Sequence, residues 1–237
     1  MGRRWPRLKR AENQKWTVDL AYACGLLATD GSLSKDGRHI NLTSKDIEQL
    51  ETFKRCLGLT NKIGWKISGY TGKMNSQVQF GNVVLYRWLV SIGIGPHKTK
   101  SIGVVRIPDE YFFDFLRGEF DGDGSSHAYW DTRWHSSVSL YIQFVCASKC
   151  HLEWLRTTVF RLIGSRGVMG KSRSIFQLKF AKTQALPLFE SMYYSGDIPY
   201  LSRKKEKLDR QWTALKQSKL GILPEGFNRN GSIIKIA

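Results

Sequence analysis

The sequence is short of cysteine, and its cysteines have neither disulfide-scaffold nor metal-site spacing. The four cysteines in 237 residues are Cys24, Cys56, Cys146 and Cys150. So few, at such irregular intervals, exclude a disulfide scaffold, and we expect reduced thiols that lie mostly in the core. Cys146 and Cys150 with His151 lack a fourth ligand at a suitable spacing, which disfavours a zinc site.

Long apolar runs are also missing. The longest extends from about Leu20 to Ala28 and is far shorter than the roughly 18 residues that a membrane-spanning helix needs. The basic segment from Met1 to Arg10 is not followed by the apolar segment of a secretory signal. We therefore expect an intracellular protein without a membrane partner, working in an organelle or in bacterial or archaeal cytoplasm.

Motifs of several enzyme classes are absent. The five histidines do not have the His-Glu-x-x-His spacing of a metalloprotease. The sequence has no nucleophile elbow and no phosphate-binding glycine loop. These absences disfavour an enzyme that acts on something other than nucleic acid.

Acidic residues are scarce beside basic ones. The chain has 37 Lys and Arg against 20 Asp and Glu, a formal net charge of +17, and 41% hydrophobic residues. The hydrophobic content predicts a folded core, and the positive charge favours a polyanionic partner. Nucleic acid is the first such partner to consider.

Two segments of the chain repeat each other. Tyr22–Ser32, with the sequence YACGLLATDGS, is echoed by Phe115–Ser125, with the sequence FLRGEFDGDGS. Each copy leads through an alternating strand and a Ser-Lys pair into a helix that ends at a glycine. Further alternating strands, a second apolar helix and a basic segment follow in both halves. The predicted positions are 39–43, 44–45, 58, 63–67, 78–80, 83–92 and 97–100 in the first half, and 140–145, 148–149, 164, 176–180, 185–194 and 202–205 in the second.

This order predicts an α+β fold of two pseudo-symmetric αββαββα half-domains. The second half carries an insertion at 127–137 that the first half lacks. The predicted divisions are a basic N-terminal arm at 1–15, half-domains at 16–102 and 111–215, a linker at 103–110 and a C-terminal tail at 216–237.

Each repeated helix carries small residues and ends at an aspartate. Ala21, Gly25 and Ala28 in the first helix, with Gly118 and Gly122 in the second, would let the two helices approach closely. The helices would then bring Asp30 and Asp123 together at their C-terminal ends, where Gly31 and Gly124 could form left-handed caps.

Two carboxylates beside the negative ends of two helix dipoles repel each other unless a cation neutralises them. Magnesium suits such a place because it needs few protein carboxylates and takes further ligands from water and substrate phosphates. The alternative is that Asp-Gly is only a helix-to-turn signal, but two copies in matching context favour the metal site.

The two motifs resemble those of the LAGLIDADG homing endonucleases. Ala23–Gly31 stands in the place of the first motif and Leu116–Gly124 in that of the second, and the resemblance covers nearly the whole chain. The first copy departs from the family by having Ala28 and Thr29 where Asp and Ala are frequent. The resemblance to the single-chain, two-motif members implies half-domains packed through the motif helices. It also implies two curved antiparallel sheets that form a DNA-binding saddle.

The resemblance also implies roles for individual residues. Asp30 and Asp123 are the implied metal ligands, and a backbone carbonyl of Gly31 or Ala28 is a further candidate. A lysine near each aspartate is implied at Lys98 and Lys204, with Lys100 and Lys205 as rivals in register. Polar residues that position water are implied at Ser44 and Ser148, for which helix N-capping is an equal alternative. Asp121 faces elsewhere on its helix, so we expect a structural or solvent role for it.

The polar faces of the strands are the expected DNA-reading surface, since a β-ribbon fits the major groove. Candidate readers or phosphate contacts are Lys66, Gln77, Gln79, Gln177 and Lys179. For each of them the alternative is a solvated strand face.

The function that follows is that of an intron-encoded homing endonuclease, acting as a monomer on double-stranded DNA. It would hydrolyse both strands at a long site with Mg²⁺; Mn²⁺ would substitute, and Ca²⁺ would support binding without cleavage. One alternative is a catalytically inactive DNA-binding regulator of the same fold. Another is a maturase that binds intron RNA. The ends of the sequence lack the splicing residues of an intein.

Overall fold

A computed structural model describes residues 14–67, 72–130 and 138–219 of the chain. The predicted order of elements is confirmed in both halves. The first half contains α1 (Val18–Thr29), β1 (Gly31–Leu33), β2 (His39–Ser44), α2 (Ile47–Leu57), β3 (Gly64–Ile67), β4 (Met74–Gly81) and α3 (Val83–Ile92). The second contains a 3₁₀ turn (Asp109–Tyr111), α4 (Phe112–Asp123), β5 (Ser125–Trp130), β6 (Val138–Cys146), α5 (Lys149–Ile163), β7 (Val168–Ser172), β8 (Ile175–Ala181), α6 (Lys182–Met192) and α7 (Ser202–Lys219).

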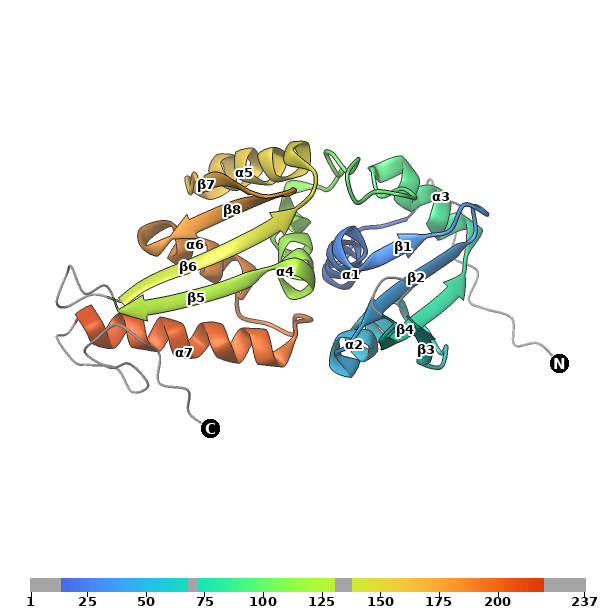
Figure 1. The fold of residues 1–237 in the computed structure, drawn as a ribbon, viewed down its shortest axis with the longest axis horizontal. Helices are drawn as coiled ribbons and strands as arrows, with labels where there is room; N and C mark the ends of the chain where they lie inside the picture. Colours follow the sequence, from blue (N-terminus) through green and yellow to red (C-terminus); the bar gives the residue numbers. More distant parts are fainter. Residues whose placement is uncertain (1–13, 68–71, 131–137, 220–237) are drawn as a thin grey trace. The chain divides into compact units, whose positions relative to one another are not determined.

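The strands form two four-stranded antiparallel sheets with equivalent topology (Figure 1). Their orders are β1-β2-β4-β3 and β5-β6-β8-β7. Each sheet therefore joins two hairpins through its inner strands, β2 with β4 and β6 with β8. The predicted α+β class with antiparallel sheets is confirmed.

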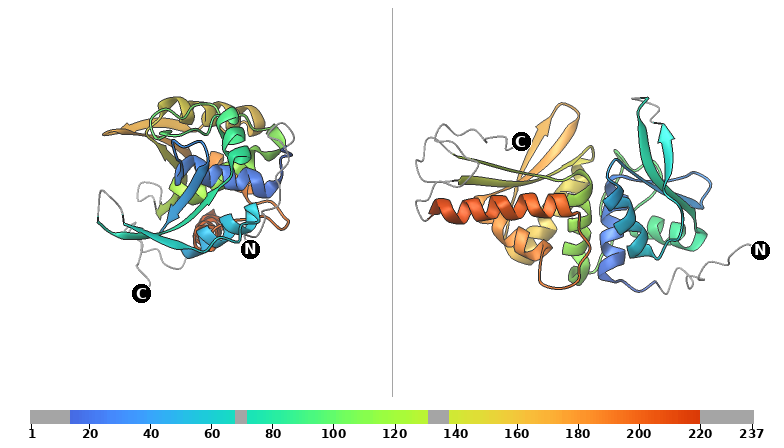
Figure 2. Two further views of the ribbon diagram at one scale, coloured as in Figure 1. Left: turned by 90° about the vertical axis from the view of Figure 1, so that its right-hand side faces the viewer. Right: turned by 90° about the horizontal axis from the view of Figure 1, so that it is seen from below.

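One face of each sheet is apolar and lies against helices. In the first sheet Ile40 pairs with Phe80 and Leu42 with Val78, and all four side chains are buried. Helices α2 and α3 pack on these strands. The second sheet repeats the arrangement with α5 and α6, and its buried pairs are Ile142 with Phe180 and Phe144 with Leu178. Figure 2 shows the β3–β4 hairpin reaching beyond the helices that cover its sheet.

Two helices end at the glycines that were predicted to terminate them. Gly58 ends α2 and Gly164 ends α5, and both have left-handed backbone. The expectation for the motif helices was wrong, because neither Gly31 nor Gly124 is among the described residues with positive φ. Asp30 caps α1 with ordinary helical dihedral angles, φ −84° and ψ −6°.

Position 31 requires glycine because there is no space for a side chain, and not because of a left-handed backbone. A Cβ atom at this position would lie 2.6 Å from both the Cα and the carbonyl oxygen of Leu27. The chain therefore leaves α1 so close to the preceding turn of the helix that no side chain fits there.

The C-terminal part of the second half differs most from the prediction. The residues from Ser202 to Lys219 form one long helix, α7, that includes the predicted basic segment and the first residues of the predicted tail. The expected insertion begins as a continuation of β5 up to Trp130, and its remainder lies outside the described residues.

The chain divides into two compact units. One runs to Asp123 and includes Ser195–Tyr200, and the other contains Gly124–Tyr194 and the residues from Leu201 onward. Helix α4 falls in the first unit because it packs against α1. The linker predicted at 103–110 separates the two sequence repeats, whereas the two compact units are defined by packing between residues.

The burial of the cysteines differs from the expectation. Cys24 is buried, but Cys56 and Cys146 are half-buried and Cys150 is exposed, so the expectation of mostly core thiols was wrong. No helix in the described part of the chain has the length and apolar character needed to cross a membrane.

Candidate functional site

Helices α1 and α4 pack so closely that their backbones touch. A Cβ atom at Gly25 would lie 2.1 Å from the carbonyl oxygen of Phe115, and one at Gly118 would lie 2.2 Å from that of Tyr22. Both distances are far below van der Waals contact, so only glycine fits at either position. The predicted close approach of the two repeated helices is confirmed.

The contact continues to the C-terminal ends of both helices. A Cβ atom at Gly122 would lie 2.0 Å from Thr29 Oγ1 and 3.2 Å from Asp30 Oδ2. Gly122 directly precedes Asp123, the last residue of α4. The backbone that carries Asp123 is therefore in contact with the end of α1 that carries Asp30. Asp30 is half-buried and Asp123 is exposed.

Gln49 on α2 is a site residue that the sequence did not indicate. Its amide nitrogen Nε2 lies 3.3 Å from Asp30 Oδ2 and 3.4 Å from the carbonyl oxygen of Asp121, and donates to both. Its oxygen Oε1 accepts a hydrogen bond of 2.6 Å from the Ser44 hydroxyl. Ser44 thus fixes Gln49, and Gln49 orients the carboxylate of Asp30. The signal that was available is a polar residue beside Leu50 on the buried side of an amphipathic helix.

Ser44 and Ser148 occupy similar positions but have different partners. Ser148 Oγ caps α5 by accepting from the backbone nitrogen of His151 at 3.5 Å. Ser44 Oγ also accepts a backbone hydrogen bond, from Asp46 at 3.0 Å, in addition to its contact with Gln49. Ser148 therefore acts as the N-cap of α5, whereas Ser44 is linked to Asp30 through Gln49.

The lysine that follows the first half lies beside the first aspartate. Lys98 is 8% exposed. Its Nζ donates to the carbonyl oxygens of Thr29 and Gly31 at 3.2 and 2.7 Å. These residues flank Asp30, so the ammonium group stabilises the negative end of the α1 dipole. Its rival Lys100 is exposed.

The second half places its lysine in the corresponding way. Lys204 Nζ donates to the carbonyl oxygen of Gly124, the residue after Asp123, at 2.8 Å. The rival Lys205 forms an ion pair with Asp209 on the same helix at 2.6 Å. In each half, therefore, one lysine of the candidate pair contacts the backbone beside the aspartate: Lys98 and not Lys100 in the first half, and Lys204 and not Lys205 in the second.

A buried polar network holds α4 in place. Arg117 is fully buried, forms an ion pair with Asp114 at 2.7 Å and donates to the carbonyl oxygen of Pro199 at 2.7 Å. Asp121 is buried and accepts a hydrogen bond of 2.8 Å from the Tyr22 hydroxyl on α1. This contact agrees with the structural role expected for Asp121.

The donor set at the helix ends fits a hard divalent cation. It offers the carboxylates of Asp30 and Asp123, and magnesium prefers oxygen ligands. In the part of the chain that the structure describes, no group of three or more His, Cys, Asp or Glu side chains could hold a metal ion. Two carboxylates leave room for water and substrate oxygens, as a catalytic magnesium site requires. Of the two candidate carbonyl ligands, that of Gly31 accepts from Lys98, and Ala28 lies in the buried last turn of α1.

The predicted DNA-contacting residues lie on the polar faces of the sheets. Gln77 and Gln79 alternate along β4 with the buried Val78 and Phe80. Lys66 on β3 pairs with Asn75 and so shares their face. In the second sheet Gln177 and Lys179 alternate in the same way with the buried Leu178 and Phe180. All five therefore point away from the helices.

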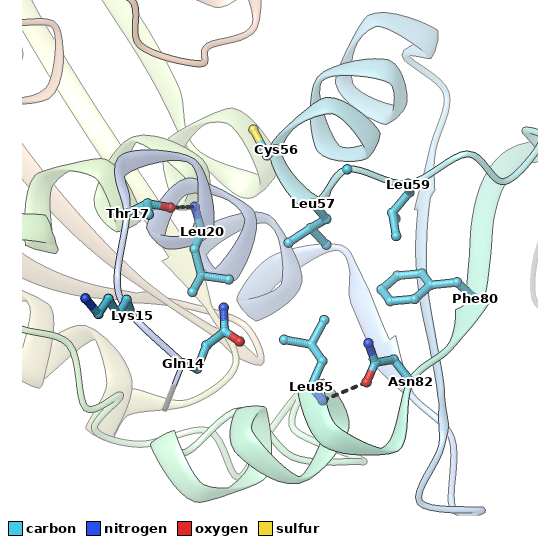
Figure 3. A pocket seen from close by; sticks show the side chains of 11 residues that line it. Gln14, Lys15, Thr17, Leu20, Cys56, Leu57, Leu59, Phe80, Asn82 and Leu85 are labelled. Carbon is cyan, nitrogen blue, oxygen red and sulfur yellow. Dashed lines mark hydrogen bonds between the residues drawn. The ribbon is translucent and has the colours of Figure 1, made fainter. Parts of the chain in front are cut away.

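An apolar cavity of about 200 Å³ lies at the other end of α1 (Figure 3). Two helix-capping residues line it, Thr17 for α1 and Asn82 for α3. Cys56 is also there; burial, with the nearby charge of Asp19, raises the pKa of its thiol to about 12. A protonated thiol is a poor nucleophile. None of the predicted site residues lines this cavity.

Comparison with known proteins identifies the fold. No family model matches the sequence, and no curated protein matches it. Among solved structures, the LAGLIDADG meganuclease I-AabMI bound to uncleaved DNA is 15% identical, with 86% of this chain and 92% of that chain covered and a TM-score of 0.57. The meganuclease I-SmaMI bound to uncleavable DNA is also 15% identical, with 90% and 94% covered and a TM-score of 0.57.

The chain is also similar in fold to a protein that is not named as an endonuclease. Full-length DUF199/WhiA from Thermatoga maritima is 15% identical, with 86% of this chain covered and a TM-score of 0.52. This chain spans 63% of that one. At these identities the similarities show a shared fold: the chain has the LAGLIDADG two-domain fold, with two antiparallel sheets and repeated motif helices.

Proposed function

We propose that this protein is a metal-dependent endonuclease of the homing type, which hydrolyses one phosphodiester in each strand of a long duplex DNA site. The observation that carries the proposal is the contact of Gly122 with Thr29 and Asp30. It brings together two helix ends that each bear a carboxylate. A structural protein gains nothing from two such carboxylates, because they repel each other and oppose both helix dipoles.

Asp30 and Asp123 would hold Mg²⁺, and Mn²⁺ would replace it. When bound, the ion activates a water molecule and stabilises the charge on the phosphate oxygens. Gln49 keeps the carboxylate of Asp30 in one orientation through the hydrogen bond of 3.3 Å. Lys98, held at 2.7 Å from the Gly31 carbonyl, adds positive charge beside the phosphate. The proposal needs no side chain as general base.

The polar sheet faces would bind the DNA. Each presents neutral donors and acceptors together with lysine, the mixture suited to base edges and phosphates. The net charge of +17 supports a polyanionic partner. We further propose that the chain acts as a monomer, because the repeat supplies two motifs in one chain. An intron as the place of its gene is proposed on the family resemblance alone.

A cleavage assay on a randomised duplex library tests the proposal. The wild type is compared with Asp30→Asn and Asp123→Asn in Mg²⁺, and Ca²⁺ serves as the condition for binding without cleavage. We expect cutting at one long site, and each substitution should abolish cutting while specific binding in Ca²⁺ persists. Unaltered cleavage by either variant would contradict the shared metal site.

A second function is favoured by one observation, the similarity to WhiA, whose name does not describe a nuclease. The alternative is a DNA-binding regulator that has this fold and does not cut. Specific binding to a duplex with no cleavage in Mg²⁺ or Mn²⁺ would establish it.

A further inference from the structure

A group of basic residues lies where α7 meets the edge of the second sheet. β5 is an edge strand, and α7 packs along β5 and β6, as Figure 1 shows. Lys207 Nζ donates to the carbonyl oxygen of Ser126 on β5 at 2.7 Å. One turn earlier, Lys204 makes the corresponding bond to Gly124 at 2.8 Å. These two lysines hold the basic side of α7 against the backbone of the edge strand and of Gly124, the residue before it.

His127 and Lys179 extend this group across the sheet. Ser125 pairs with Gln143, and Gln143 pairs with Lys179, so Ser125 and Lys179 lie in one row on the same face. His127 is two residues from Ser125 and shares that face. Its Nε2 lies 3.3 Å from Ser125 Oγ. The exposed face thus carries an imidazole, a hydroxyl and an ammonium group close together.

The electrostatics of this group are strongly positive. Burial, with the charges of Lys207 and Lys179, lowers the pKa of His127. Burial and the charge of Arg203 on α7 lower the pKa of Lys207. Among the described residues, no carboxylate forms an ion pair with Lys179 or Lys207. A positive potential without an internal counter-charge favours an external anion.

The first half has no such group at the corresponding positions. The row that matches Ser125, Gln143 and Lys179 is Ser32, Asn41 and Gln79, and it is uncharged. By the repeat, Ser34 corresponds to His127 and Ser101 to Lys207. The cluster therefore does not belong to the repeated machinery of the metal site, and it makes the two halves electrostatically unequal.

We propose that His127, Lys179 and Lys207 form a binding site for one backbone phosphate of duplex DNA, present on the second half only. The donors suit this ligand: two ammonium groups, the hydroxyl of Ser125 and an imidazole N–H, all able to donate to phosphate oxygens. The site lies on the polar face that also carries Gln143 and Gln177, so a duplex lying on that face meets it. The inference rests on the proposed function, because it takes DNA as the substrate.

The site makes DNA binding dependent on pH. In the free protein burial and the neighbouring lysines lower the pKa of His127 and so favour its neutral form, whereas a phosphate beside it would favour the protonated form. Binding then takes up a proton, and the affinity rises as the pH falls toward the range where the free His127 itself titrates. The charged groups that act on His127 are Lys207 from α7 and Lys179 from β8, and Arg203 on α7 acts in turn on Lys207.

Fluorescence anisotropy of the full chain with a random-sequence duplex, in Ca²⁺ and across a range of salt and pH, tests the site. Lys179→Gln and Lys207→Gln are each expected to reduce the slope of log affinity against log salt by about one. The matched control is Arg156→Gln, which removes one exposed positive charge from α5, in the helical layer of the same unit. His127→Gln should abolish the gain in affinity on acidification and leave the salt slope at neutral pH unchanged.

Two outcomes would overturn the inference in different ways. If the wild type binds duplex DNA and both lysine variants behave like Arg156→Gln, the phosphate site is wrong and the proposed endonuclease is unaffected. If the wild type does not bind duplex DNA, both fail. Circular dichroism of each variant shows whether the fold is intact, and two independent lysine variants keep the test decisive if one does not fold.

Discussion

Gln49 connects Ser44 to Asp30, so its removal tests whether orientation of the carboxylate matters. Gln49→Ala deletes the hydrogen bond to Asp30 at 3.3 Å and leaves the metal ligands themselves intact. We expect single-turnover cleavage to slow by roughly 10- to 100-fold and to require more Mg²⁺, as is usual when the partner of a metal ligand is lost.

The control for Gln49 lies at the corresponding place in the other half. Glu153 on α5 forms an ion pair with Lys149 at 3.0 Å and is not linked to an aspartate by any described contact. Glu153→Ala should cleave at the wild-type rate. A Gln49→Ala variant with the wild-type rate and metal requirement would show that Gln49 has only a structural role.

Arg117 provides a test of stability at a single residue. Arg117→Met leaves the carboxylate of Asp114 buried without the guanidinium that neutralises it at 2.7 Å. Breaking a buried ion pair in this way costs about 3–5 kcal/mol, which urea unfolding followed by circular dichroism measures. The double variant Asp114→Leu with Arg117→Met should recover part of the loss. A loss below about 1 kcal/mol in the single variant would contradict this assignment.

Most of the candidate site could be predicted because it is repeated. Asp30 and Asp123 stand out since each ends a helix of matching sequence, and Lys98 and Lys204 since each follows the last strand and helix of its half. Gln49 could not be predicted in this way, because the other half has Glu153 at the matching position. His127 and Lys207 also have no counterpart in the first half, so the repeat could not point to them. They come close to each other only through the pairing of the strands and the packing of α7.

At the scale of elements, the crossing of α1 and α4 depends on two glycines. Gly25→Ala would place its Cβ 2.1 Å from the Phe115 carbonyl oxygen, so the helices must separate. We expect a loss of about 3 kcal/mol or more of unfolding free energy, because backbone atoms cannot move aside as a side chain does. Metal-dependent cleavage should fall as well, since the helix ends part.

Gly64→Ala is the matched control, because a Cβ at Gly64 on β3 meets no atom within 4 Å. Thermal unfolding of the two variants under identical conditions makes the comparison. Equal melting temperatures would show that the close crossing is not needed for stability.

The elements were predicted well wherever their apolar spacing was regular. The helix at 83–92 was predicted with the bounds that α3 has, because its capping residue Asn82 and terminal Gly93 mark both ends. Helix α7 was missed because its many charged residues hide the apolar positions Leu208, Ala214 and Leu215, which are buried. The left-handed caps at Gly31 and Gly124 were wrong, because a glycine demanded by close packing looks the same in sequence as one demanded by positive φ.

At the scale of the whole molecule, the net charge of +17 should govern DNA affinity. If each half makes several phosphate contacts, about six to ten counterions are released in all, and affinity falls by roughly 10³–10⁵ between 50 and 200 mM salt. Anisotropy titrations with nonspecific duplex at several salt concentrations measure this slope. A flat dependence on salt would contradict nucleic acid as the partner.

The burial of α1 limits how far the gene can be shortened while still encoding a stable protein. Every residue from Leu20 to Ala28 is buried, and a helix that is apolar on all sides needs partners on all sides. Helix α4, which supplies one of those partners, is encoded after the linker. A gene truncated at the linker would therefore encode a chain with an uncovered apolar helix, and we expect such a chain to aggregate. We therefore expect the first half to persist alone only if a second copy of a motif helix takes the place of α4.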